Sequence, residues 1–304
     1  MAMGKKRAKQ QALFIATAEL PRTAGHVFYD RMNAILEERA FDGFVEKACV
    51  KFYKSEEIGR PSMAPGVYFR MLMAGYFEGI SSERGIAWRC ADSSGLKQFL
   101  GFGYTDAVPD HSTLSRTRRL IDLETHQEVF TWLLKVLTEH GLVDGKTMGV
   151  DATTLEANAA MRSIVRRDTG ESYREFLTGL AKTSGIETPT AEDLARTDRS
   201  RKNKASNKDW THPGDADARI AKMKDGSTHM AHKVEHAVDM KTGAILAVTV
   251  QGADMGDTET IQATLTAVAV QMETLEQDPE VAGTIRQDWL KWNAPRFSSL
   301  KFSR

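Results

Sequence analysis

The chain has 304 residues, of which 41% are hydrophobic and 27% are charged, a composition typical of a globular protein with one or two domains. Its 41 basic and 41 acidic residues cancel, so a nucleic-acid partner has to be argued from local clusters of charge. The sequence contains no run of 18 apolar residues, no signal-peptide pattern and no metal-binding cysteine spacing. We therefore expect a cytoplasmic protein with reduced thiols and no membrane partner.

Helical patterns dominate the first 140 residues. Apolar residues at three- and four-residue steps predict helical structure over 24–56, and Ser62 is expected to cap the next helix. A short helix is predicted over 93–100. A longer helix, capped by Asp110 or Ser112, is then expected to run as far as residue 141.

Strand patterns appear after residue 141. They predict a strand over 146–155, a hairpin formed by 229–238 and 244–250, and an amphipathic helix over 259–276. Polar sequence between the first strand and the hairpin reads as an insertion at about 159–227. The expected fold class is therefore α+β, with a helical domain over 1–140 and a mixed α/β domain over 141–304.

Two acidic positions follow predicted strands. Asp151 belongs to the segment Gly149-Val-Asp-Ala-Thr-Thr-Leu-Glu-Ala-Asn158, where a carboxylate at a strand end can bind Mg²⁺, a cation that prefers oxygen ligands. A solvated turn carboxylate is the ordinary alternative. Asp257 lies between a strand and a helix, where capping the helix is the alternative to a role in the site. Lys233, on the neighbouring strand, is either a phosphate contact or an exposed strand lysine.

Basic residues cluster in two regions that could meet a phosphate backbone. A helix starting near Ser112 follows a short helix and a glycine turn, as the recognition helix of a helix-turn-helix motif does. A second cluster lies in the insertion, and a solvated surface is the alternative for both clusters. The candidate DNA-binding residues are Ser115, Arg116, Arg118, Arg119, Arg199, Arg201, Lys202 and Lys204.

Several segments in order resemble bacterial insertion-sequence transposases of the InsH-like type. Residues 68–88 and 109–119 are similar to the N-terminal domain of that family. Residues 149–158 resemble the first catalytic block of its DDE domain, and 231–239 and 248–257 resemble the strands that follow. The resemblance extends from about residue 11 to about residue 275.

The resemblance implies a helical DNA-binding domain followed by an RNase H-like catalytic domain. It also implies Mg²⁺-dependent cleavage at transposon ends and strand transfer into target DNA, which two metal ions held by about three carboxylates carry out. Asp151 matches the first carboxylate and metal ligand, and Asp257 matches a recurrent family position. The implied partners are DNA and either a second copy of this chain or a full-length transposase.

After residue 276 the chain departs from the family pattern, since the blocks that carry the later catalytic acids are not found. We therefore expect an incomplete RNase H-like DDE domain, truncated at its C-terminal side, without strand-transfer activity of its own. One alternative is a non-catalytic DNA-binding or inhibitory protein. Another is an unstable remnant with no role.

Overall fold

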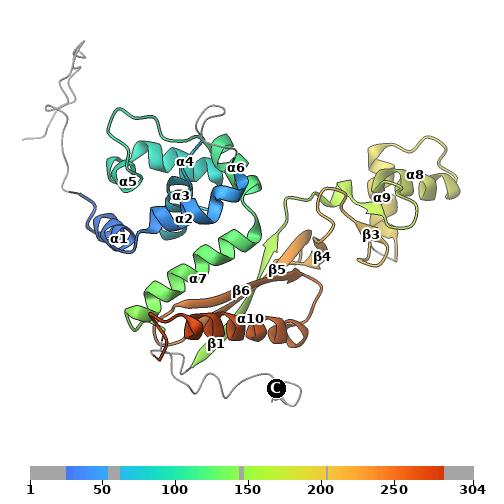
Figure 1. Cartoon of the computed structure of the whole chain (residues 1–304). Coiled ribbons are helices and arrows are strands. Elements are labelled where there is room, and N and C mark those ends of the chain that lie inside the picture. Colours follow the sequence, from blue (N-terminus) through green and yellow to red (C-terminus); the bar gives the residue numbers. More distant parts are fainter. Residues whose placement is uncertain (1–24, 54–61, 144–146, 203–204, 284–304) are drawn as a thin grey trace, which may run out of the picture. The chain divides into compact units, whose positions relative to one another are not determined.

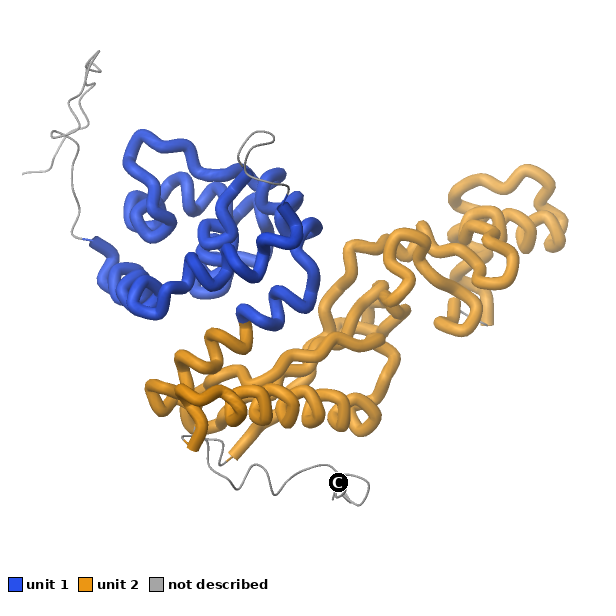
Figure 2. The backbone as a smooth tube through the Cα atoms, viewed as in Figure 1, with its two compact units in different colours: residues 1–129 blue, residues 130–304 orange. Residues whose placement is uncertain are grey.

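The computed structural model describes residues 25–53, 62–143, 147–202 and 205–283 (Figure 1). In this part of the chain, helices combine with a mainly antiparallel sheet, which agrees with the expected α+β class. The chain divides into two compact units, Met1–Val129 and Phe130–Arg304 (Figure 2). The boundary falls inside the helix α7 (Leu123–Glu139).

The described part of unit 1 is helical. Its elements are α1 (Val27–Glu38), α2 (Phe41–Cys49), the 3-10 turn η2 (Val50–Phe52), α3 (Pro65–Phe77), α4 (Glu83–Asp92), α5 (Ser94–Phe99), α6 (His111–Leu120) and the first part of α7. The described residues of the segment 24–56 are mainly helical, as predicted, and Ala40, with a left-handed φ of 49°, separates α1 from α2. The predicted cap at Ser62 is wrong, since α3 begins at Pro65 after Ala64.

The long helix predicted from Asp110 to residue 141 is also two helices. Asp110 caps α6 by accepting a hydrogen bond from the Thr113 backbone N–H at 2.7 Å. The helix ends at Leu120, and the Asp122 carboxylate then accepts from the Thr125 backbone N–H at 2.8 Å. A second capping aspartate therefore starts α7, and the apolar periodicity alone does not reveal this break.

A buried arginine, Arg70, links several helices of unit 1. The Arg70 guanidinium, on α3, donates two hydrogen bonds to the Asp42 carboxylate on α2 and one to the Asn33 side chain on α1. It also lies over the rings of Phe41 and Phe99, 5.6 and 6.0 Å from their centroids. This buried cation thus ties α3 to three other helices.

Unit 2 contains the sheet, whose long central strand is β5 (Thr228–Asp239). On one side β5 pairs with β1 (Met148–Glu156), and its other partners are β6 (Ile245–Gly252) and β4 (Arg219–Lys222). All these pairings are antiparallel. The predicted strand and hairpin are therefore present, but β4 shows that the sheet takes in part of the predicted insertion.

The helix α10 (Asp257–Gln277) packs against the sheet, as Figure 1 shows. Side chains alternate between the two faces of a strand, so Ala237 and Ala247, which pair across β5 and β6, lie on one face. They join Val268 and Met272 of α10 in a buried cluster. The same face carries Lys233 and Glu235, which lie four and two residues before Ala237.

The insertion has a small core of its own. Its elements are η3 (Met161–Ser163), β2 (Val165–Arg166), α8 (Tyr173–Thr183), α9 (Ala191–Ser200) and β3 (Trp210–Thr211). Trp210 meets Tyr173 and Phe176 edge to face, with ring centroids 5.1 and 5.2 Å apart. The predicted polar and partly irregular segment is therefore folded around aromatic side chains.

Candidate functional site

A pocket of about 290 Å³ opens where β1 and β5 meet the first turn of α10. Its walls combine residues of β1, of β5, of the turn that precedes α10 and of the start of α10. The residues that line it are Val150, Asp151, Ala152, Thr154, Lys233, Glu235, Ala253, Met255, Asp257 and Ile261. Both predicted catalytic aspartates are thus at the pocket, together with a lysine and a glutamate.

Lys233 and Glu235 form a buried ion pair in this pocket, with side-chain exposures of 6% and 2% and an Nζ–Oε1 distance of 3.1 Å. The Lys233 ammonium also contacts the Asp257 carboxylate at 2.6 Å and donates to the Thr260 hydroxyl at 2.8 Å. Glu235 accepts hydrogen bonds from the hydroxyls of Thr260 and Thr264, the latter at 2.5 Å. The network therefore joins β5 to the first two turns of α10.

For both Lys233 and Glu235, polar contacts outweigh burial in setting the direction of the pKa shift. Burial by itself raises the pKa of Glu235, but hydrogen bonds from Thr260, Thr264 and Lys233 bring that pKa below its ordinary value. Burial lowers the pKa of Lys233, but the contacts with Asp257 and Glu235 raise it overall. Both groups are therefore ionised near neutral pH, as a salt bridge requires.

Asp257 is the exposed member of the network, with a side-chain exposure of 86%. It does not cap α10, because the carboxylate of Glu259 accepts from the Gly256 backbone N–H at 3.2 Å. The capping role weighed for Asp257 is thus taken by another acid. Asp257 instead turns its carboxylate to Lys233.

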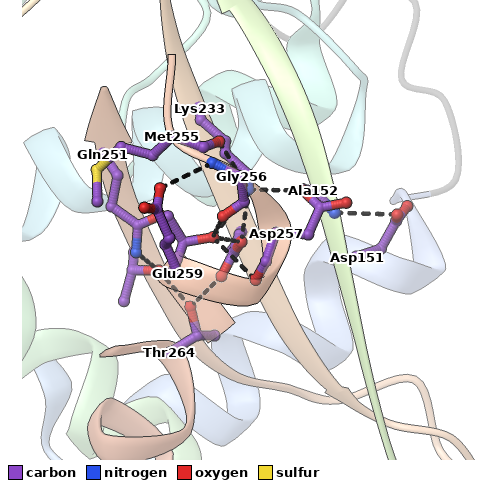
Figure 3. A network of polar contacts seen from close by, with 12 residues as sticks. Asp151, Ala152, Lys233, Gln251, Met255, Gly256, Asp257, Glu259 and Thr264 are labelled. Atoms are coloured by element: carbon purple, nitrogen blue, oxygen red, sulfur yellow. Dashed lines mark hydrogen bonds and ion pairs between the residues drawn. The ribbon is translucent and has the colours of Figure 1, made fainter. Parts of the chain in front are cut away.

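Asp151 lies on the other face of the sheet from this network. It pairs with His236, whereas Ala152 pairs with Glu235, and neighbouring residues of a strand point to opposite faces. The Asp151 carboxylate accepts from the Ala152 backbone N–H at 2.9 Å, and Figure 3 shows it pointing away from Lys233 and Asp257. The structure brings Asp257 to Lys233 and Glu235 but does not direct Asp151 toward them.

This arrangement does not fit a Mg²⁺ site. Both carboxylate oxygens of Glu235 are used by hydrogen-bond donors, and Asp257 faces an ammonium ion. Asp151 points away from both. Among the described residues, no group of three or more His, Cys, Asp and Glu side chains could hold a metal ion. Metal binding by Asp151 and the catalytic roles of Asp151 and Asp257 stay predictions.

The predicted recognition helix is α6. Arg116 donates to the Ser112 carbonyl at 3.2 Å, and Arg119 donates to the Ser115 carbonyl at 3.4 Å. Both guanidinium groups are exposed, and their hydrogen bonds among the described residues stay within α6. Arg118 differs, because it forms an ion pair with Glu83 of α4 at 3.2 Å.

The packing of α6 differs from the predicted helix-turn-helix arrangement. The helix buries Leu114 and Thr117, and its main helical neighbour is α4, not the short helix α5 that precedes it. Helix α5 ends in a turn at Gly101, whose φ is +81°, and the chain continues to Asp110 without a regular element. The basic helix is present, but its partner helix is an earlier one.

The basic residues of the insertion separate into two kinds. Arg201 is held within the fold, since it contacts the Asp198 carboxylate and the Tyr173 hydroxyl at 2.9 and 2.8 Å. It also lies 5.4 Å from the centroid of Phe176. Arg199 and Lys202 are exposed on the surface. Lys204 lies outside the described residues.

Sequence reasoning missed Glu235, Thr260 and Thr264 and left Lys233 as a choice between two roles. A signal was available in Ala231-His-Lys-Val-Glu-His-Ala237, where two opposite charges occur at alternate positions of an otherwise apolar strand face. Two threonines four residues apart lie on one face of a helix and can meet such a pair. The contact itself depends on how α10 packs, which the local sequence does not state.

The N-terminal part of the chain is similar to a known protein family. Residues 17–120 match the family described as Transposase domain (DUF772), and the match ends at the last residue of α6. It supports a transposase function in general, for which DNA is the implied partner. No curated protein and no solved structure matches the chain. In the described ranges no helix is long and apolar enough to cross a membrane.

Proposed function

We propose that this protein is a DNA-binding protein of the insertion-sequence transposase type, which recognises element ends through α6. The observation that carries the proposal is a capped basic helix, with Arg116 and Arg119 exposed, inside the segment that matches a transposase domain. Arginine side chains on such a helix can contact phosphates and the edges of guanine bases. Ser115, half-exposed on the same helix, is the polar candidate between them.

The exposed insertion residues Arg199 and Lys202 are proposed as additional phosphate contacts. Arg201 supports them indirectly, because its guanidinium holds the end of α9 against Tyr173. Such contacts add affinity without sequence preference and weaken as the salt concentration rises. The order of strand, insertion, hairpin and helix in unit 2 is what the family resemblance implies for the start of an RNase H-like DDE domain.

A selection experiment tests this proposal. The full chain would be incubated with random duplex DNA, and the bound fraction sequenced after several rounds. We expect one enriched motif, whose binding falls at least tenfold in the double variant R116A/R119A. Lys47→Ala, which removes an exposed charge from α2, serves as the control and should leave binding within about twofold. Absence of an enriched motif, with equal binding by all three proteins, would refute recognition by α6.

We further propose that DNA recognition, and not strand transfer, is the activity that the described residues carry. Asp151 is the candidate first metal ligand, but the other two acids of the pocket are engaged, Glu235 by Lys233 and two threonines and Asp257 by Lys233. The selected DNA ends would be incubated with the full chain and Mg²⁺. A joined product that forms with the unaltered chain and not with D151N would contradict this proposal. It would favour a chain that is itself active as a transposase. Addition of a full-length transposase would then test the predicted protein partner.

A further inference from the structure

The number of N–H donors on the Lys233 ammonium equals the number of oxygen atoms close to it. It has three N–H donors, and it faces three oxygen partners within 3.1 Å, on Glu235, Asp257 and Thr260. Glu235 is equally well matched, because hydroxyl donors from Thr260 and Thr264 complete its contacts. Neither buried charge depends on a bound ligand for its compensation.

Of the two carboxylates that contact Lys233, Glu235 is buried and Asp257 is open to solvent. A divalent cation bridging Glu235 and Asp257 would need the space between the two carboxylates, and the Lys233 ammonium already lies there. We propose that this ammonium is the resident counter-cation of the pocket and that it prevents Asp257 from binding a divalent metal ion. This role goes beyond the proposed DNA recognition and does not depend on it.

The electrostatic argument compares the pocket with and without the ammonium. Lys233, Glu235 and Asp257 together carry a charge of minus one, whereas the two carboxylates alone carry minus two. A positive charge a few ångströms away opposes a divalent ion even at the dielectric constant of water. Removal of the lysine charge should therefore raise divalent-cation affinity at this site by at least about tenfold.

The test is Mn²⁺ binding to the full chain, measured through the electron paramagnetic resonance signal of the free ion. Asp257→Asn alters an exposed side chain, so this variant should fold, and we expect it to bind Mn²⁺ as the unaltered chain does. Lys233→Met should gain a Mn²⁺ site. The double variant K233M/D257N should lose the gained site, because Asp257 would be its main ligand.

Two results would overturn the inference. One is a Mn²⁺ site in the unaltered chain that Asp257→Asn abolishes, since Asp257 would then bind metal beside Lys233. The other is a folded Lys233→Met protein, with an unchanged circular dichroism spectrum, that gains no site. If Lys233→Met fails to fold, Lys233→Gln is measured in its place, because glutamine removes the charge and keeps a donor for Glu235. The comparison of Asp257→Asn with the unaltered chain does not depend on either lysine variant. Asp151→Asn reports separately on the metal site expected from the transposase resemblance.

Discussion

The Arg70–Asp42 pair should be asymmetric, with loss of the acid costing more than loss of the base. The Arg70 side chain is 8% exposed and that of Asp42 is 50% exposed. Asp42→Ala leaves a buried guanidinium whose remaining acceptors among the described residues are the Asn33 side chain and the Gly66 carbonyl. Arg70→Met retains apolar volume and leaves a carboxylate that water can solvate.

The magnitudes follow from this difference in exposure. Breaking a fully buried ion pair by removing one partner costs about 3–5 kcal/mol. Because Asp42 is half-exposed, we expect about 2–3 kcal/mol for Asp42→Ala and about 1–2 kcal/mol for Arg70→Met. At about 1.4 kcal/mol per factor of ten, the first change should raise the opening equilibrium constant of unit 1 by roughly 30- to 150-fold.

Thiol labelling measures this opening in the intact chain. Both cysteines of the sequence, Cys49 and Cys90, are buried in unit 1, and burial raises the pKa of each to about 11. They react only when the unit opens, so the labelling rate follows the opening equilibrium when reclosing is fast. Labelling in Asp42→Ala should be faster than in Arg70→Met, and both should exceed the unaltered chain.

A control uses a second bidentate arginine–aspartate pair, Arg166–Asp168. Asp168, in unit 2, accepts from Arg166 at 2.8 and 2.6 Å, and both partners lie far along the chain from the cysteines. Asp168→Ala should leave cysteine labelling within about twofold. Equal rates for Asp42→Ala and Arg70→Met, or an order opposite to the expected one, would show that burial of the guanidinium does not set the cost.

Three further changes test other local features. Ala40→Gly should slow cysteine labelling about two- to fivefold, because glycine relieves the left-handed strain of a residue with φ 49°. Asn207 exchanges two hydrogen bonds with the Ile220 backbone, at 2.6 and 3.0 Å, so Asn207→Asp should speed hydrogen exchange at 205–222 by roughly tenfold. Hydrogen bonds from the Thr113 backbone N–H and from Ser112 lower the pKa of Asp110 to about 2. Its contribution to α6 should therefore be complete above pH 3.8 and lost as the pH falls through about 2, a helicity change that Asp110→Asn should abolish.

The sequence located most elements but missed the division between α6 and α7. The predicted cap at Asp110 or Ser112 placed the start of α6 correctly, because an N-cap is a local contact within three residues. The break before α7 depends on Asp122 acting in the same way only two residues after α6 ends. Apolar periodicity continues across this break, so it predicts the buried face well and the helix ends poorly.

The site was less predictable than the fold because its contacts are long-range. The resemblance marked Asp151 and Asp257 by position, but the strand register puts Asp151 on the face away from Glu235, and the start of α10 brings Asp257 to Lys233. Arg201 entered the DNA-binding set by charge alone, and only the fold shows that Tyr173 and Asp198 engage it. Charge along the sequence therefore identifies candidates, and packing separates surface contacts from internal ones.

The buried Lys233–Glu235 pair of the pocket needs an explanation other than stability. A buried ion pair is costly to desolvate, and replacement by apolar side chains is often neutral or stabilising, so stability alone is a weak explanation for Lys233 and Glu235. What the pair does achieve is a fixed charge at the start of α10, with Asp257 held beside it at 2.6 Å. A fixed ammonium and a mobile metal ion would compete for the same carboxylate. Comparing Mn²⁺ binding before and after Asp257→Asn therefore decides whether this pocket holds a cation of its own or recruits one.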